Sequence, residues 1–424
     1  MNIQKDVFVQ IGATRDGLDY YLDCARERNL HSILIETPHY LSLRKDLSRR
    51  KFNTEIALEN PSDIKSVVNA LKGVKNNIAL ILPGFDCYVS TTYAVSKALE
   101  VPPYRSEVEK HFSPPNKDEQ RTTLRNLAPN VSQPNFQVVS RTSKNYIDKW
   151  FGFPLVVKPI NGAGGLGVHL VNNEQELIKS LELIFGLNNY NGVQFDKVII
   201  EEYVRGTEMS IQGICFNGLP IVLSFCEKVI KVDEVKPAES IKCFREAGHV
   251  AIPGNQLPED LYEFVKSSVA AFNYYSGPFH IDFVICNGKP FFLEMGYRLS
   301  GGAIVELVKK LTNINWAELS FSSYLKEKIP ESYYLAEPRF NCMGLATVQT
   351  ESALRIANSL KESGEKIDVQ KINTNICEIA KQKPLSTKLS ADMARHGSGM
   401  GKLWINGNSS KEVLDLIKMC QGIN

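Results

Sequence analysis

The sequence lacks the features that would place the protein in a membrane, on nucleic acid or in an oxidising compartment. No stretch approaches the ~20 apolar residues that a membrane-spanning helix needs. The formal net charge of only +2 gives no strong attraction for polyanions. The nine cysteines are odd in number and never in C-x-x-C spacing, so neither a disulfide framework nor a zinc knuckle is supported. The sequence therefore predicts neither a nucleic-acid nor a membrane partner.

Two further features are missing. The N-terminus has no apolar core of a secretion signal, because Met1–Asp6 leads directly into the strand-like run Val7–Ile11. We therefore expect a cytoplasmic protein. No Ser/His or Cys/His pair of a nucleophilic enzyme is recognisable. With 424 residues, of which 43% are hydrophobic, the chain is long enough to bury a large core and to divide into two to four domains.

The first hundred residues alternate strand and helix. Val7–Ile11 and Ser32–Glu36 flank a helical pattern and predict a β-α-β unit. Asn77–Leu82 predicts a further strand, and Val89–Leu99 the next helix. A parallel sheet with covering helices is the fold class typical of this α/β pattern. Gly12–Gly17 lacks the full dinucleotide pattern, so we interpret this part as scaffold that can also contact substrate.

The stretch Val101–Pro115 contains four prolines and predicts a linker or a domain edge. A helix is expected from Asn116 and a strand near Pro134–Val139. Lys117 is unusual at the start of this helix, because cations are disfavoured at the positive end of a helix. A bound phosphate would offset this charge, and a solvated lysine is the alternative.

A glycine-dense loop, Gly162–Gly167, has the G-x-G-x-x-G spacing of a dinucleotide fold. That fold requires a helix after the loop, whereas Pro154–Pro159 and Gly167–Val171 predict strands on both sides. We interpret the loop as a lid whose backbone N–H groups bind phosphate oxygens. A flexible surface loop is the bland alternative, but it does not explain Lys158 just before the loop.

Two later segments carry acids. The strand predicted over Asp196–Val204 ends in Glu201 and Glu202 and could hold a nucleobase, or it could be a strand end with solvated acids. The segment His280–Arg298 predicts a β-hairpin.

The hairpin turns at Asn287-Gly288. A three-residue loop would place Asp282 directly opposite Glu294 on one face. Two adjacent carboxylates need a cation between them, and oxygen ligands suit Mg²⁺. Arg298 would project from the same side to hold a phosphoryl group. A structural salt bridge among the three side chains is the alternative.

In this order, the residues resemble the ATP-grasp superfamily of carboxylate–amine ligases. Phe244–His249, Gly277–His280 and Arg298–Gly302 are similar to the branch that contains the L-amino acid ligases. The resemblance implies an ATP-grasp fold of mixed α/β (α+β) class. Its expected parts are an N-terminal Rossmann-like parallel-sheet domain (1–110), an ATP-grasp domain (111–325) with a small glycine-lid subdomain (about 145–205), and a C-terminal α+β domain (326–424).

The resemblance also implies roles for individual residues, with ATP and two Mg²⁺ ions as cofactors and Mn²⁺ as a possible substitute. Arg298 and Lys158 would be catalytic, and Asp282 and Glu294 would ligate metal. Substrate contacts would come from His249, His280, Gly301 and Gly302, although a structural role is an alternative for both histidines. The residues expected to bind ATP are Lys117, Lys158, Gly162, Gly164, Gly165, Gly167, Glu201, Glu202, Tyr203, Val204 and Glu208.

The chain departs from the family pattern at two positions. Many members carry Glu at the first metal position and Asn two residues after the second acid, where this chain has Asp282 and Gly296. Without the Asn ligand, one metal would be held more weakly. Because both acids and Arg298 remain, activity is still expected.

The expected reaction joins a small carboxylic acid, such as an amino acid, to an amine through an acyl phosphate, releasing ADP and phosphate. Alternatives are a ligase or carboxylase that acts on a nucleotide precursor or bicarbonate, a non-catalytic ATP-binding protein, and a nicotinamide-dependent oxidoreductase. A homodimer is the default for enzymes of this kind.

The final hundred residues change character. Val348, Leu354, Ile356 and the run Thr374–Ile379 suggest small strands and helices. Gly397–Gly401 predicts a tight turn before the strand Lys402–Ile405. Ser409 is expected to cap the final helix.

Overall fold

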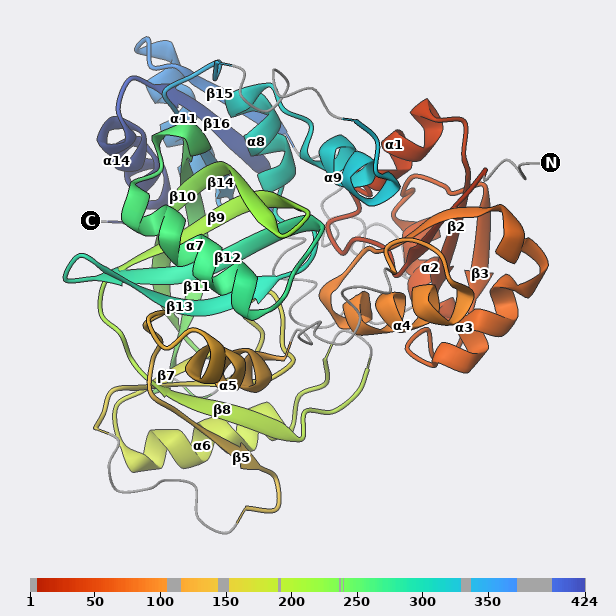
Figure 1. Ribbon diagram of the computed structural model, residues 1–424. Coiled ribbons are helices and arrows are strands. Elements are labelled where there is room, and N and C mark those ends of the chain that lie inside the picture. Colours follow the sequence, from red (N-terminus) through yellow and green to blue (C-terminus); the bar gives the residue numbers. More distant parts are fainter. Residues whose placement is uncertain are drawn as a thin grey trace.

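The computed structural model describes residues 6–104, 116–143, 152–189, 192–235, 238, 240–328, 337–371 and 399–423. Within these ranges the chain forms a small parallel sheet and a large antiparallel sheet, with helices on both (Figure 1). The predicted mixed α/β class is confirmed. None of the helices in the described ranges combines the length and the apolar character needed to cross a membrane.

The small sheet has the strand order β3-β2-β1-β4, and the pairs are parallel. Its central strands, β2 and β1, are buried on both faces, apart from the first residue of β2, as expected for apolar runs covered by helices on both sides. Phe8 faces α1 and α9, whereas Val7 and Val9 face α3 and α4. The elements of this part are β1 (Val7–Ile11), α1 (Tyr21–Glu27), β2 (His31–Glu36), α2 (Pro38–Asp46), β3 (Thr54–Ala57), α3 (Ile64–Leu71), β4 (Ile78–Pro83) and α4 (Val89–Leu99).

The large sheet runs β13-β12-β9-β10-β11-β7-β6-β8-β5, and β14 adds β16 and β15 through its pairing with β11. The C-terminal strands therefore continue the sheet of the central segment. The strands are β5 (Phe136–Ser140), β6 (Leu155–Pro159), β7 (His169–Val171), β8 (Lys197–Glu202), β9 (Thr207–Phe216), β10 (Leu219–Glu234), β11 (Lys242–Pro253), β12 (Gly277–Cys286), β13 (Lys289–Gly296), β14 (Cys342–Val348), β15 (Ile367–Lys371) and β16 (Gly401–Gly407).

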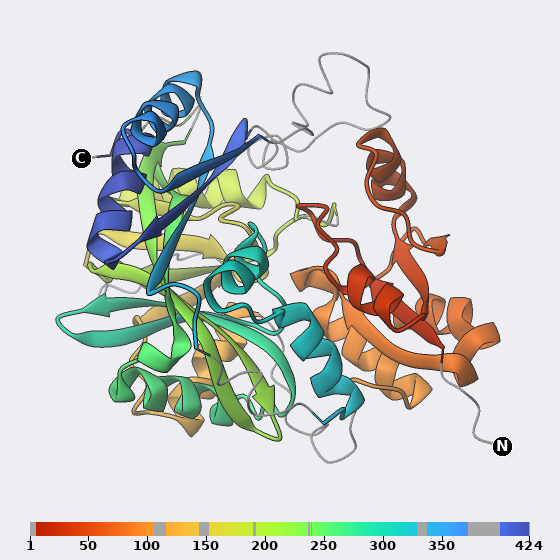
Figure 2. The ribbon, with the colours of Figure 1, turned by 90° about the horizontal axis from the view of Figure 1, so that it is seen from above.

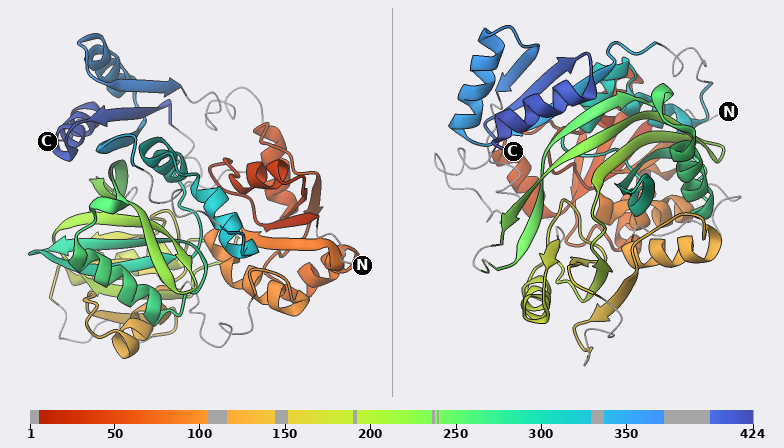
Figure 3. Two further views of the ribbon diagram at one scale, coloured as in Figure 1. Left: turned by 45° about the horizontal axis from the view of Figure 1, so that its top comes forward. Right: turned by 90° about the vertical axis from the view of Figure 1, so that its left-hand side faces the viewer.

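Seven α-helices of the described ranges accompany this sheet. Helices α5 and α7 share a hydrophobic cluster with β9, β12 and β13, and α6 packs on β6 and β8. Helix α9 lies between the two sheets, against α1 on one side and β12 on the other (Figures 2 and 3). The helices are α5 (Lys117–Leu127), α6 (Glu174–Phe185), α7 (Glu259–Ala271), α8 (Ile304–Thr312), α9 (Trp316–Leu325), α11 (Glu351–Glu362) and α14 (Ser410–Gln421).

Local sequence signals account for several of these boundaries. The predicted helix Val89–Leu99 is confirmed as α4, which ends where Glu100 adopts the left-handed conformation. Ser409 caps α14 as expected, because its side chain accepts from the backbone N–H of Glu412. The predicted segment Thr374–Ile379, with Gly397 and Ser398 of the glycine cluster, lies outside the described residues.

Alternation along β12 separates an apolar face from a polar one. Phe279, Ile281 and Phe283 are buried against α7, whereas His280 and Asp282 point to the opposite face. The sheet thus presents a row of polar side chains on the face away from α7.

Candidate active site

The floor of the candidate site is the polar face of β9, β12 and β13. Asp282 lies directly opposite Ser210 on one side and Glu294 on the other. Residues that oppose each other in an antiparallel pair project to the same face. The predicted juxtaposition of Asp282 and Glu294 is therefore confirmed.

The structural feature that brings Asp282 opposite Glu294 differs from the one that we expected. Cys286 pairs with Lys289, so the loop has two residues, and Asn287 and Gly288 both have positive φ. The three-residue loop that we expected is wrong. A β-bulge between Asp282 and Phe283 supplies the extra residue on β13 and brings the acids into register.

Each acid is held by its own lysine. The ammonium of Lys117 lies 2.7 Å from Glu294 Oε2 and donates to Gly162 O at 2.8 Å. Lys117 is only 8% exposed, so the alternative of a solvated lysine is wrong. Although burial opposes ionisation, Lys117 and then Lys158 and His280 hold the pKa of the Glu294 carboxyl at about 2.

Asp282 belongs to a second cluster that is centred on Lys228. The Lys228 ammonium lies 2.8 Å from Asp282 Oδ2, 2.9 Å from Glu246 Oε1 and 3.0 Å from Glu208 Oε1. Burial opposes its charge, but these acids, Asp282 foremost, raise the pKa of Lys228 well above its ordinary value. Three carboxylates around one ammonium leave a net negative charge, which suits a further cation.

Lys158 forms a buried triad with Glu201 and Arg121. The Lys158 ammonium lies 2.6 Å from Glu201 Oε2, and the Arg121 guanidinium lies 2.6 Å from Oε1. Although burial disfavours the charged form, Arg121 and Lys158 lower the pKa of Glu201. Burial lowers the pKa of Lys158, and Arg121 and Lys117 add to the effect while Glu201 opposes it. The Glu201 carboxylate is thus engaged by protein cations.

The glycine loop connects two antiparallel strands, β6 and β7. Because a strand follows it, the dinucleotide-fold interpretation of this loop is wrong. Gly164, Gly165 and Gly167 have positive φ, which L-residues rarely adopt. At Gly162 a Cβ would lie 2.7 Å from Pro159 Cγ, so the loop depends on glycine there as well.

The segment after β8 follows the triad. The Tyr203 ring stacks on Phe244 with ring centroids 6.0 Å apart, and Glu202 accepts from Asn135 Nδ2 at 3.0 Å. Val204 is half-buried beside them. These positions continue β8 past Glu201, and the Tyr203 backbone N–H donates to the carbonyl of Pro154 just before β6.

Arg298 extends toward the small sheet. Its guanidinium pairs with Asp86, which follows β4, and lies over the Phe85 ring at 5.9 Å. Burial opposes the charge of Arg298, but Asp86, Glu294 and Asp16 raise its pKa. Since Asp282 and Glu294 pair with lysines instead, the alternative of one salt bridge among the three is wrong.

The remaining predicted residues lie around this floor. His249 is opposite Lys228 on β11, with its Nε2 3.6 Å from Glu246 Oε2, and burial lowers its pKa. His280 is opposite Gly296. Gly301 and Gly302 are exposed in the turn before α8.

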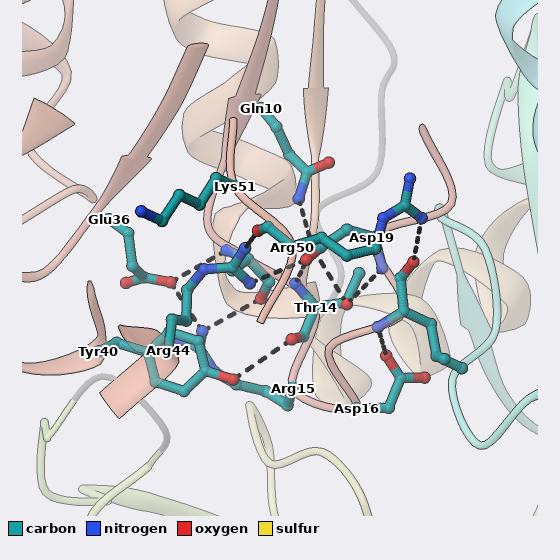
Figure 4. A network of polar contacts seen from close by, with 12 residues as sticks. Gln10, Thr14, Arg15, Asp16, Asp19, Glu36, Tyr40, Arg44, Arg50 and Lys51 are labelled. Atoms are coloured by element: carbon teal, nitrogen blue, oxygen red, sulfur yellow. Dashed lines mark hydrogen bonds and ion pairs between the residues drawn. The ribbon is translucent and has the colours of Figure 1, made fainter. Parts of the chain in front are cut away.

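A polar network fixes the loop after β1 (Figure 4). Glu36 accepts from the Ala13 backbone N–H and pairs with Arg15 at 2.7 Å. Asp19 accepts from Thr14 and pairs with Arg44 at 2.8 Å. These buried acids stabilise the loop that carries Asp16, one of the charges that act on Arg298.

Sequence reasoning missed four residues of the site. It assigned no role to Lys228, and it did not single out Arg121, Glu246 or Asp86. Lys228 had a local signal, because a charged residue interrupts a mostly apolar strand. The other three meet their partners through tertiary contacts that one sequence does not reveal.

Comparison with known proteins shows which family this part of the chain resembles. Residues 116–302 match the family described as the ATP-grasp domain. This part of the chain is therefore similar to ATP-grasp domains. It includes both acids of the floor, all three lysines and the glycine loop.

Curated relatives of the chain include D-alanine–D-alanine ligases. The chain is 29% identical over 154 residues to D-alanine–D-alanine ligase A of Bacillus cereus, which covers 35% of this chain and 45% of that protein. It is 35% identical over 102 residues to D-alanine–D-alanine ligase of Fervidobacterium nodosum, which covers 23% and 30%. The matches thus span less than half the length of these relatives.

Solved structures resemble the chain along its whole length. L-amino acid ligase from Bacillus licheniformis superposes with a TM-score of 0.69 at 18% identity, covering 99% of this chain and 98% of that one. Carboxyaminoimidazole ribonucleotide synthase from Aspergillus clavatus, in complex with ATP, gives 0.66 at 13% identity and covers 100% of both chains. At these identities the likeness establishes the fold, which agrees with the expected ATP-grasp fold.

Proposed function

We propose that the protein is an ATP-dependent carboxylate–amine ligase that forms an amide or peptide bond and releases ADP and phosphate. The observation that carries this proposal is the polar floor, on which Asp282 opposes Glu294 and each acid is paired with a lysine. Two opposed carboxylates suit Mg²⁺, and adjacent ammonium groups suit phosphate oxygens.

Different side chains would bind the phosphates, hold the metal ions and stabilise the acyl phosphate. Lys117, Lys158 and the loop Gly162–Gly167 would hold the phosphates of ATP, and Asp282 and Glu294 would hold two Mg²⁺ ions or Mn²⁺ in their place. Bound metal offsets the charge of the phosphates. The substrate carboxylate would accept the γ-phosphoryl group, and Arg298 would stabilise the acyl phosphate until an amine displaces phosphate.

The contacts to adenine, ribose and substrate are proposed from where the residues lie around the lysines and acids of the site. Tyr203 and Val204 would contact adenine, with Glu201 and Glu202 behind them, and Glu208 would reach the ribose. His249, His280, Gly301 and Gly302 would line the substrate space beyond Arg298.

Relatives support amino acids or small carboxylic acids as substrates. The names of the D-alanine–D-alanine ligases and of the L-amino acid ligase describe amide formation between amino acids. The predicted domain bounds, the cytoplasmic location and the homodimer stay predictions.

A second candidate is carboxylation of a nucleotide precursor, in which bicarbonate replaces the amino-acid carboxylate. It is supported by the whole-length likeness to carboxyaminoimidazole ribonucleotide synthase. The two candidates share the ATP site and differ in the acid and the amine.

Phosphate release from ATP tests the proposal. The purified protein is incubated with ATP and Mg²⁺, with pairwise mixtures of amino acids in one series and with bicarbonate plus aminoimidazole ribonucleotide in the other. We expect release that depends on amino-acid pairs, a condensed product detected by mass spectrometry, and loss of both in Glu294→Ala. Release only with bicarbonate would establish the second candidate. ADP binding without release in either series would contradict both and favour a non-catalytic protein.

A further inference from the structure

Strand β13 lies at an edge of the large sheet, and its outward-facing backbone groups need partners. Among the described strands it pairs with β12 alone. Buried backbone N–H and C=O groups are almost always hydrogen-bonded, so a covered edge has to be satisfied by other groups. At Met295 the partner is one side chain. Gln120 Nε2 on α5 donates to Met295 O at 2.8 Å, and the Met295 backbone N–H donates to Gln120 Oε1 at 2.9 Å.

This pair of hydrogen bonds is buried and depends on an amide. Gln120 and Met295 are each 1% exposed. A side-chain amide offers a donor and an acceptor together, whereas a carboxylate lacks the donor and an apolar side chain lacks both. Loss of the amide would leave two buried backbone groups without partners, which is costly. The contact therefore fixes one point of α5 on β13.

The contact lies next to two charges of the candidate site. Glu294 directly precedes the bonded residue of β13, and Lys117 lies three residues before Gln120 on the same side of α5. The Lys117 ammonium lies 2.7 Å from Glu294 Oε2 and donates to Gly162 O at 2.8 Å. The Lys117 backbone N–H donates to Ile160 O at 3.0 Å. Helix α5 is thus anchored to the start of the lid at its first residue and to β13 one turn later.

We propose that Gln120 is a positioning residue of the candidate site, which holds Lys117 beside Glu294 before the nucleotide binds. This inference rests on the proposed ATP-binding function. A lysine ammonium sits on a flexible four-carbon stem, so the placement of its helix decides where the charge can reach. Groups that are ordered in advance lose less freedom when a ligand binds. Without Gln120, the nucleotide would have to order Lys117 and Glu294 itself.

A double-variant cycle in nucleotide affinity tests this role. Calorimetry measures the Kd for ADP with Mg²⁺ in the full-length wild type, in Gln120→Met, in Lys117→Met and in the double variant. Methionine keeps the length of glutamine but forms neither hydrogen bond to the strand. We expect Gln120→Met to weaken ADP binding about 10-fold, which lies within the range of coupling between neighbouring residues. Because Gln120 acts through Lys117, the double variant should bind no more weakly than Lys117→Met alone.

Gln133→Met is the matched control. The Gln133 amide also bonds α5, but it donates to Arg121 O on the helix itself, at 2.9 Å, rather than to β13. We expect its Kd for ADP to stay within about twofold of the wild type and to show no coupling to Lys117→Met. Circular dichroism confirms that each variant folds. Gln120→Asn, whose amide is one methylene shorter, replaces Gln120→Met if that variant does not fold, and should show the same coupling with a smaller loss.

The outcomes separate this inference from the proposed function. Losses that multiply in the double variant, or a Gln120→Met variant that binds ADP like the wild type, would overturn the role of Gln120 and leave the ligase proposal intact. An equal loss in Gln133→Met would show general disruption of α5 and would also overturn it. Coupling between Gln120 and Lys117, together with no substrate-dependent phosphate release by the wild type, would support the positioning role and contradict the reaction. A wild type that does not bind ADP would overturn both.

Discussion

Glu201 is the residue on which two buried cations depend. Its carboxylate is 2% exposed and pairs with Arg121 at one oxygen and Lys158 at the other. Removing one partner of a buried ion pair costs more than the pair contributes, because an uncompensated charge stays behind. Both cations are buried, so removing the Glu201 charge would leave two buried charges uncompensated.

Glu201→Gln should therefore destabilise the protein strongly. We expect a loss of about 3 to 5 kcal/mol in the free energy of unfolding, the range typical of a broken buried pair. Urea denaturation followed by fluorescence measures it. The matched variant Glu202→Gln, at the half-buried neighbour, should change stability by less than about 0.5 kcal/mol. Equal effects at both positions would show that burial of the pair does not matter.

For single residues, the sequence identified several charged side chains of the site but not the side chains with which they pair. Lys117, Lys158 and Glu201 stood out because each is a charged residue beside a predicted strand or helix end. Arg121 lies within a helix among other polar residues, and Glu246 is an exposed acid on a long strand. Only the folded sheet shows that Glu246 meets Lys228.

Among the elements, the hairpin of β12 and β13 shows where local rules are sufficient. Asn287-Gly288 predicts a tight turn, and the turn forms there. The alignment of Asp282 with Glu294 requires one extra residue on β13, which a longer loop or a bulge could supply. The sequence does not separate these two solutions, because both give the same pairing of the acids. The structure uses the bulge.

The unit formed by β6, β7 and α6 contains a buried histidine that makes its stability depend on pH. His169 on β7 bonds Ser180 on α6 at 2.9 Å, and burial lowers its pKa from 6.5 to about 4. The unfolded chain therefore binds an extra proton between these two pH values. Stability is fully present above pH 6.5 and falls as the pH drops toward 4.

Hydrogen exchange over residues 155–185 measures this dependence. Between pH 7 and pH 4.5 we expect the free energy of local opening to fall by roughly 2 to 3 kcal/mol, after correction for the intrinsic exchange rate. His169→Leu should lose most of this dependence, whereas His39→Leu, at an exposed histidine of α2, should keep it. A wild-type slope that survives in His169→Leu would assign the effect to another group.

For the whole molecule, the contact between Arg298 and Asp86 joins the two sheets across 212 residues of sequence. The sequence predicted Arg298 as a catalytic residue and a parallel sheet that could contact substrate. It could not connect them, because the residue that follows β4 meets the residue that follows β13 only when the two sheets pack. Arg28 adds a second connection at the outer side, where it pairs with Glu318 at 2.5 Å and with Glu327 at 2.8 Å.

Asp86 should therefore act as a positioning residue for Arg298 in the proposed reaction. The pair and the Phe85 ring fix the guanidinium, and its displacement by about 1 Å can cost on the order of 100-fold in rate. We expect Asp86→Ala to lower kcat for substrate-dependent phosphate release by 10- to 100-fold while the Kd for ADP stays within about twofold. Asp86→Glu should recover part of the rate, and Glu59→Ala, at an exposed acid of the same part of the chain, should not change it. An equal loss of ADP binding would instead indicate general disruption of the fold. An unchanged kcat would mean that Arg298 keeps its position without Asp86, through the burial and the Phe85 contact alone.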